Sequence, residues 1–189
     1  MKGKRLLGVW TLAFLGVAGL FALTWAGDDI KTRAMLRGLG PISVEVEHFD
    51  LELRDRLKRG GLTEDGLLAA VERKLQAAGI RLLSDEDSQK APFPPVLYVN
   101  LQILVPEVKF TYTVGGEQIS KEKSGERHFY RVDVELRQMA SLLRDPLING
   151  EVATWSSGSM GFRRLPRIQA DVMDQVDAFI SACSGESTK

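Results

Sequence analysis

The stretch Phe129–Gln138, FYRVDVELRQ, decides the fold, because apolar and charged residues alternate along most of it with a period of two. That period is typical of a β-strand with one dry face and one wet face. The apolar positions are Tyr130, Val132, Val134 and Leu136. The charged positions are Arg131, Asp133, Glu135 and Arg137. The stretch therefore predicts a half-buried strand that presents four charges to solvent.

Working outward, the same strand signals appear at residues 42–49 (ISVEVEHF), 96–105 (VLYVNLQILV) and 149–159 (NGEVATWSSGS). A short strand is predicted at 80–83, and residues 109–114 extend the pairing toward a turn at Gly115 and Gly116. Residues 117–127 are polar enough for a hairpin tip, and residues 84–95 are predicted as a loop. Residues 50–61 fit either a strand extension or a short helix.

Two stretches carry the apolar stripe of an amphipathic helix, residues 62–80 and 165–183. Thr63 is a good first cap and Gly79 a good terminating residue for the first helix. Pro166 suits the first turn of the second helix. Its Asp171, Asp174 and Asp177 recur every three residues and predict an acidic stripe on a solvated helix face.

The order of these elements predicts an α+β fold. We expect a two-layer sandwich, with a mostly antiparallel sheet of about five strands and two helices on one face. An apolar helix at the N-terminus precedes it. The predicted organisation is a signal peptide or membrane anchor at 1–26, a tether at 27–40, the α+β domain at 41–183 and a disordered tail at 184–189.

The first 26 residues predict export. Lys2, Lys4 and Arg5 precede a run without charge from Leu6 to Gly27. A basic start followed by an apolar run is typical of an export signal, and Thr24 and Ala26 suit cleavage before Gly27. The run also has the length of roughly 20 residues that spans a bilayer. Both readings predict a periplasmic domain, with residues 6–26 as an inner-membrane anchor if they are retained.

The composition argues against nucleic-acid binding and against a Cys/His zinc site. The chain has 25 basic and 25 acidic residues among 189, so no basic excess favours nucleic-acid binding. With two histidines and one cysteine, the chain cannot form a Cys/His zinc site without carboxylates. No phosphate loop or nucleophile elbow is present, and no cofactor or metal site is predicted.

The charges of Phe129–Gln138 admit three interpretations. Asp133 and Glu135 are spaced so that two carboxylates could share acid and base chemistry, as in a hydrolase. Alternatively, acids flanked by arginines simply pair along a solvated face. The third interpretation is a partner-docking face, selected by complementary charge. Its predicted residues are Glu45, Glu47, Arg131, Asp133, Glu135 and Arg137.

Two further candidates are weaker. Phe110, Tyr112 and Trp155 could line a groove for a small ligand or lipid, although core packing suits Trp155 as well. His48 and His128 each stand at a strand end, where a shared metal site would require neighbouring strands and added acids. Solvent-exposed or core histidines are the expected alternative.

Residues 40–83, 94–104 (PPVLYVNLQIL), 130–145 (YRVDVELRQMASLLRD), 151–161 (EVATWSSGSMG) and 176–182 (VDAFISA) resemble a group of uncharacterised exported bacterial proteins. More loosely, the layout is similar to envelope accessory domains of lipopolysaccharide assembly and of transporters. This chain lacks their lipidated cysteine. The resemblance implies an architecture and an export route, and it transfers no site residue.

The sequence therefore predicts a non-enzymatic protein of the bacterial envelope that binds another envelope component through its polar sheet face. The alternative is a periplasmic domain that binds a small ligand or lipid. A carboxylate-dependent hydrolase is a further possibility.

Overall fold

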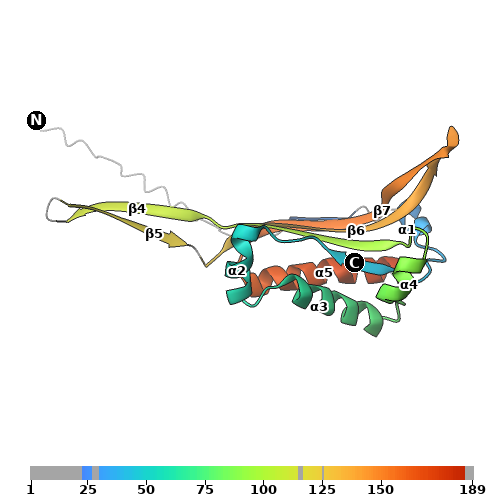
Figure 1. The fold of residues 1–189 in the computed structure, drawn as a ribbon, viewed down its shortest axis with the longest axis horizontal. Helices are drawn as coiled ribbons and strands as arrows, with labels where there is room; N and C mark the ends of the chain where they lie inside the picture. The colour runs from blue at the N-terminus through green and yellow to red at the C-terminus, as the bar shows by residue number, and fades with distance from the viewer. Residues whose placement is uncertain (1–22, 27–29, 115–116, 125, 186–189) are drawn as a thin grey trace, which may run out of the picture.

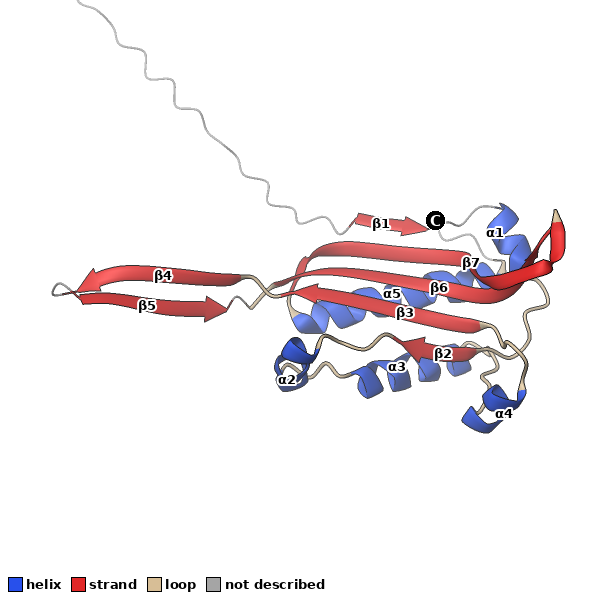
Figure 2. Cartoon of the chain, turned by 45° about the horizontal axis from the view of Figure 1, so that its top comes forward, coloured by secondary structure: helices blue, strands red, loops and turns tan. Residues whose placement is uncertain are grey.

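The computed structural model describes residues 23–26, 30–114, 117–124 and 126–185. Its centre is a mixed sheet with the strand order β7-β6-β3-β2 (Figures 1 and 2). The strands are β2 (Ser43–Val46), β3 (Val96–Leu104), β6 (His128–Leu142) and β7 (Asp145–Arg163). β3, β6 and β7 run antiparallel, whereas β2 runs parallel to β3. The parallel pair follows from the connection, because the chain crosses through helices before it returns to the sheet.

The α+β class is confirmed, and two long helices cover one face of the sheet (Figure 1). They are α3 (Glu64–Ala77) and α5 (Leu165–Ser184). Thr63 caps α3 as predicted, since its side chain accepts a hydrogen bond from the Gly66 N–H. Gly79 follows with a positive φ of 81°, which a glycine adopts without strain.

The core lies between these helices and the sheet. Strand residues of even number in β6 and odd number in β3 point into it, as the alternation predicts. Its fully buried members include Leu97, Val99, Val132, Val134, Leu136, Val71, Leu75, Ile168, Val172, Val176 and Phe179. The Trp155 ring, 1% exposed, packs edge-on against Phe179 with centroids 5.2 Å apart.

Two hairpins extend the sheet at opposite ends (Figure 1). β4 (Glu107–Val114) and β5 (Glu117–Ser124) pair as a separate two-stranded sheet that projects from one end. β6 and β7 continue past the body at the other end, with register shifts at Leu136/Arg137 and Ser141/Leu142. We call these the β4–β5 end and the β6–β7 tip.

Residues before β2 also contact the sheet and the core. β1 (Leu23–Ala26) pairs antiparallel with Ser157–Met160 of β7. Helix α1 (Ile30–Met35) falls within the predicted tether, and Leu36 is buried in the core. The predicted apolar helix lies outside the described residues up to position 22. Among the residues that are described, no helix is long and apolar enough to cross a membrane.

Three local predictions need correction or completion. Residues 50–61 form a helix, α2 (Leu51–Arg59), whose N-cap Asp50 accepts from the Glu52 N–H. The predicted loop at 84–95 contains helix α4 (Asp85–Lys90), because Ser84 caps it through the Asp87 N–H. The short strand predicted at 80–83 is reduced to one parallel bridge, between Ile42 and Leu82.

Candidate functional site

The sheet face opposite α3 and α5 carries the charged residues predicted from the sequence. Strand register places Glu45 opposite Tyr98, and Tyr98 opposite Glu135. Asp133 lies one row further along, opposite Asn100. The structure therefore brings the predicted docking residues onto one surface, which we call the polar face: Glu45, Glu47, Arg131, Asp133, Glu135 and Arg137.

The charges of the polar face pair with one another along β6. Arg131 Nε donates to Asp133 Oδ2 at 2.7 Å, and Arg137 donates to Glu135 Oε2 at 3.0 Å. The Arg137 guanidinium also stacks 3.5 Å from the centroid of the Tyr98 ring. Both carboxylates therefore already accept from a neighbouring arginine on an open surface. This pairing agrees with the interpretation of a solvated face better than with an acid–base pair.

At the β4–β5 end, the outward positions of the sheet change from charged to apolar. Register places Leu104 opposite Phe129, and Phe129 opposite Phe162. The two phenylalanine rings lie 4.6 Å apart, and Leu104 and Phe129 are 71% and 53% exposed. Met160, 40% exposed, lies in the next row opposite Arg131. We call Leu104, Phe129, Met160 and Phe162 the apolar row.

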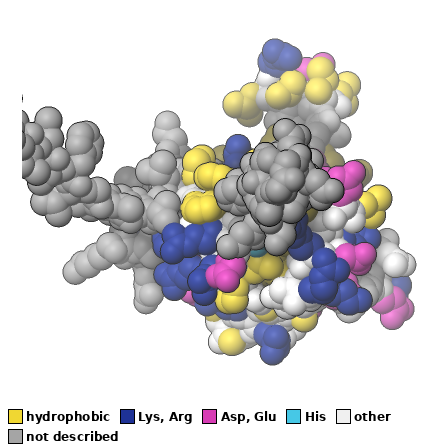
Figure 3. All heavy atoms as spheres, turned by 90° about the vertical axis from the view of Figure 1, so that its left-hand side faces the viewer, with side chains coloured by type: hydrophobic (Ala, Val, Ile, Leu, Met, Phe, Trp, Pro, Cys, Tyr) yellow, Lys and Arg dark blue, Asp and Glu magenta, His cyan; other side chains and the backbone are white. Residues whose placement is uncertain are grey.

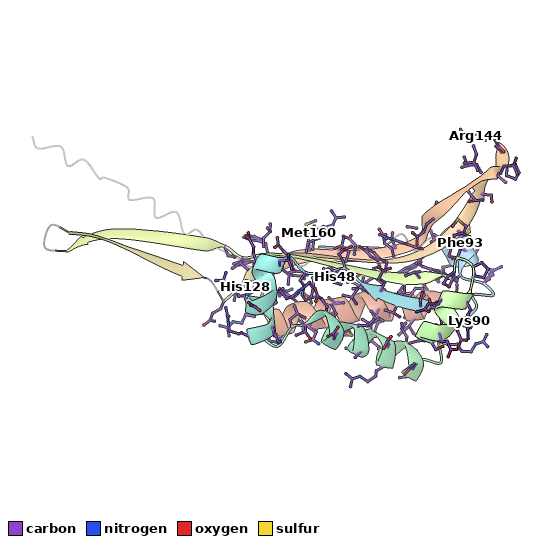
Figure 4. All side chains as sticks on the ribbon, viewed as in Figure 1. His48, Lys90, Phe93, His128, Arg144 and Met160 are labelled. Atoms are coloured by element: carbon purple, nitrogen blue, oxygen red, sulfur yellow. The ribbon has the colours of Figure 1, made fainter. Side chains whose placement is uncertain are left out.

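The apolar row borders a groove of about 820 Å³. β2 pairs with residues 96–99 only, whereas β3 continues to Leu104. The chain turns away after β2, so that residues 47–50 and the start of α2 form one wall. The ends of β3, β6 and β7 form the other. Figure 3 looks at this end of the molecule and shows apolar side chains gathered beside basic ones. Figure 4 places His48 and Met160 there.

Glu64 holds residues 47–50, the part of the groove wall just before α2, in place by hydrogen bonds. Its Oε1 accepts a hydrogen bond of 2.7 Å from the Phe49 N–H and one of 3.0 Å from Arg54 Nη2. Glu64 belongs to the first turn of α3, so the bond ties this wall to a rigid helix. The groove is therefore preformed by local contacts rather than assembled by a ligand.

A polar cluster links Tyr130, which lines the groove, to α5. The Tyr130 hydroxyl donates to Asp171 Oδ2, and Arg163 Nε and Arg167 Nε lie 3.7 and 3.6 Å from the Asp171 carboxylate. Burial, together with Asp171, raises the pKa of Tyr130 to about 12, so the phenol stays protonated at neutral pH. A Cβ on Gly161 would lie 3.1 Å from the Tyr130 ring, and the glycine leaves room for it. The cluster joins α5 to the sheet and does not supply an activated nucleophile.

Asp171 differs from its prediction. It is 5% exposed, although the three-residue spacing predicted a place in a solvated acidic stripe. Asp174 and Asp177 are exposed as expected. Periodicity could not separate them, because the partner that draws Asp171 inward is Tyr130 on a strand far away in the sequence.

Of the residues predicted to line a groove, Phe110, Tyr112 and Trp155, only Trp155 has a described side chain, and it is absent from the described lining of the groove. Trp155 is a core residue, packed between β7 and α5. Phe110 and Tyr112 lie on β4, in the projecting hairpin, and their side chains are outside the described part of the structure. Trp155 therefore belongs to the core, and the described lining of the apolar groove comes from residues 47–57 and the ends of β3, β6 and β7.

The two histidines stand in different environments. His128 is buried, and its Nδ1 has no hydrogen-bond partner among the described residues. The His48 side chain is largely exposed and its Nδ1 lies 3.7 Å from Glu64. Figure 4 shows both near the β4–β5 end. Within the described ranges, no group of three His, Cys, Asp or Glu residues is arranged to hold a metal ion.

His128 should make the free energy of unfolding depend on pH. Burial, and then the nearby Arg56, lower its pKa from the ordinary 6.5. The unfolded chain therefore binds a proton more readily, and the free energy of unfolding should fall as the pH drops from about 7 to about 5. We expect His128→Gln to show a smaller fall than the parent protein in urea unfolding. His48→Gln is the control and should retain the parent's fall; equal behaviour of the two variants would refute this role.

No protein-family model matches the chain, and no curated protein matches it significantly.

The apolar row was missed by sequence reasoning, although a signal for it exists. Leu104 and Phe129 are apolar residues on the outward face of β3 and β6, next to the polar Gln102 and Arg131, and Met160 and Phe162 stand two residues apart on β7. Each is unremarkable alone, since single exposed apolar residues are common. Only the register shows that all four meet at the same end of the sheet.

Proposed function

We propose that this chain is a non-enzymatic binding protein of the bacterial envelope, whose groove at the β4–β5 end takes an apolar ligand. The observation that carries the proposal is the preformed groove of about 820 Å³ with an exposed apolar row at its mouth. Ligand sites are commonly concave, largely apolar and of roughly 300–1,000 Å³. Exposed apolar groups that gather in one place favour burial by a ligand or partner.

Several ionisable groups in and beside the groove are engaged by neighbouring protein groups, which supports binding rather than catalysis. Tyr130 is held protonated, and Asp133 and Glu135 accept from arginines. Glu64 is engaged by the Phe49 N–H and Arg54. A reaction would need a nucleophile or base aimed into the groove, whereas these residues are engaged by neighbouring protein groups.

The first test is a fluorescence titration of residues 23–189 with the apolar probe 1-N-phenylnaphthylamine. Circular dichroism and a cooperative thermal transition would first establish that this fragment is folded. We expect saturable binding at one site and displacement of the probe by long-chain fatty acids. A signal that rises without saturation, or that fatty acids leave unchanged, would overturn the proposal.

A second candidate is docking of an envelope protein on the polar face. The observation that favours it is the gathering of the predicted docking residues on one uncovered surface. The test is crosslinking in intact cells with a C-terminal tag. A reproducible envelope partner should be lost in Arg131→Glu/Arg137→Glu and kept in Arg144→Glu, a charge reversal at the β6–β7 tip. Background proteins alone would count against docking.

We also infer that residues 1–22 are retained as a membrane anchor, with the domain in the periplasm. Two features support this: the uncharged run from Leu6 to Gly27, and the pairing of Leu23–Ala26 with β7. Cleavage before Gly27 would remove β1 and leave residues 157–160 of β7 as an unpaired edge, which proteins tend to avoid. If residues 1–26 are retained, as we infer, β1 adds a fifth strand to the sheet beside β7.

A further inference from the structure

The described chain begins beside the groove. Leu23, the first described residue, lies opposite Met160 in the β1–β7 pair, and Met160 lines the groove. The residues that precede it, 6–22, carry no charge. A helix built from them would be about 25 Å long, which lies within the range that spans the hydrocarbon core.

We propose that the groove is held at the membrane surface and receives the acyl chain of a bilayer phospholipid. This deepens the proposed function and rests on it, because it names the ligand and its source. An anchor that ends at position 22 leaves no linker before Leu23, and one residue spans at most about 3.6 Å. The apolar row therefore lies within a few residues of the anchor's outer end.

The chemistry of the row fits this ligand. Phe129 and Leu104 are exposed on an outward face of the sheet, where water would otherwise cover them. An acyl chain has no hydrogen-bonding group to satisfy, and the row offers none. The polar side chains at the groove, Glu47, His48, Asp50 and Arg131, lie at its walls, so a lipid can enter by its apolar end.

A second apolar patch supplies an internal control. Leu143 and Leu147, at the β6–β7 tip, are 102% and 90% exposed. Figure 4 shows Arg144 of this tip at the end of the molecule opposite His48 and His128. Met160 lies thirteen positions after Leu147 on β7, or about 40 Å along an extended strand. Simple exposure would label both patches, whereas a groove at the membrane surface labels only the apolar row.

The experiment uses the full-length chain in vesicles of phosphatidylethanolamine and phosphatidylglycerol. The vesicles contain a trace of phosphatidylethanolamine with a diazirine on its acyl chain. After irradiation, adducts are mapped by mass spectrometry. We expect adducts on residues 104, 129, 160 and 162 at about ten times the yield found on residues 142–148, and loss of the former in Phe129→Asp. Leu143→Asp should leave them unchanged.

Other outcomes separate this inference from the proposed function. Adducts confined to residues 6–22, in a protein whose soluble fragment still binds the probe, would overturn the bilayer lipid and leave the binding function standing. Labelling of the tip in place of the apolar row would overturn the proposed orientation. Labelling of the row by a free diazirine fatty acid, but not by the phospholipid, would overturn the bilayer as the source. Failure of every ligand, including the soluble probe, would overturn both.

Discussion

Replacing Trp155 by alanine is expected to lower the free energy of unfolding by about 3–5 kcal/mol, the largest effect of any single change considered. The indole is 1% exposed and packs edge-on against Phe179, so its loss leaves a cavity that the surrounding sheet and helix fill only in part. Urea unfolding followed by circular dichroism measures this change. Domains of this size are stable by only about 5–15 kcal/mol, so the variant should be close to its unfolding threshold.

Trp155→Phe is the matched control. Among the described residues, the indole Nε1 is buried without a hydrogen-bond partner, so phenylalanine removes an unsatisfied donor along with part of the volume. We expect a loss of only about 1–2 kcal/mol. If Trp155→Ala lost less than this, Trp155 would be a groove residue, as one sequence interpretation held, rather than part of the core.

Replacing Asp171 by alanine should cost about 2–4 kcal/mol. The change leaves the buried Tyr130 hydroxyl without its acceptor and removes the negative partner of Arg163 and Arg167. Both arginines keep some contact with solvent, which places the cost below that of stranding a wholly buried charge. Denaturant unfolding of Asp171→Ala against Asp171→Asn, which retains an acceptor, gives the value.

The same hydrogen bond can be isolated by a double-mutant cycle. Tyr130→Phe alone should cost about 1–2 kcal/mol, and Tyr130→Phe/Asp171→Ala should cost less than the sum of the single changes. A strictly additive result would show that the phenol and the carboxylate do not stabilise each other. It would also remove the reason for placing Asp171 at the junction of α5 and the sheet.

Much of the fold follows from periodicity. The alternation in 96–105 and 129–138 predicts which side chains are buried in β3 and β6, and Thr63 and Gly79 predict the ends of α3. These signals can be read from neighbouring residues in the sequence, because the spacing of apolar residues shows which face of a strand or helix is buried. Helix α4 was missed because its residues, DEDSQK, carry no apolar stripe, and only the Ser84 cap marks its start.

Properties set by partners far away in the sequence could not be predicted. The parallel pairing of β2 depends on the crossover through α2 and α3. The sequence pattern alone does not show which residues of β2 and β3 pair with each other. The burial of Asp171 depends on Tyr130, 41 positions earlier. The candidate site is of this kind: each residue of the apolar row is ordinary in its own strand, and the groove exists because β2 ends before β3 does.

For the polar face, in contrast, the residues could be predicted from the sequence but their function could not. Alternation predicted its residues, and strand register places those of β2 and β6 on one surface. Their function was not predictable, because acids and arginines two residues apart on a strand can pair together or attract a partner. The pairs of Arg131 with Asp133 and of Arg137 with Glu135 favour the first use, so the neighbouring groove is the better candidate for a binding site.

The most direct test of the central claim is a titration of apolar probe into three proteins: the parent fragment, Phe129→Ser and Leu143→Ser. Each variant removes one exposed apolar side chain, and only Phe129 borders the groove. Burial of one such side chain by a ligand contributes about 1.5–3 kcal/mol, so Phe129→Ser should weaken binding by at least about tenfold. Leu143→Ser should bind like the parent. Equal affinity in all three proteins would contradict the assignment of the groove as the binding site.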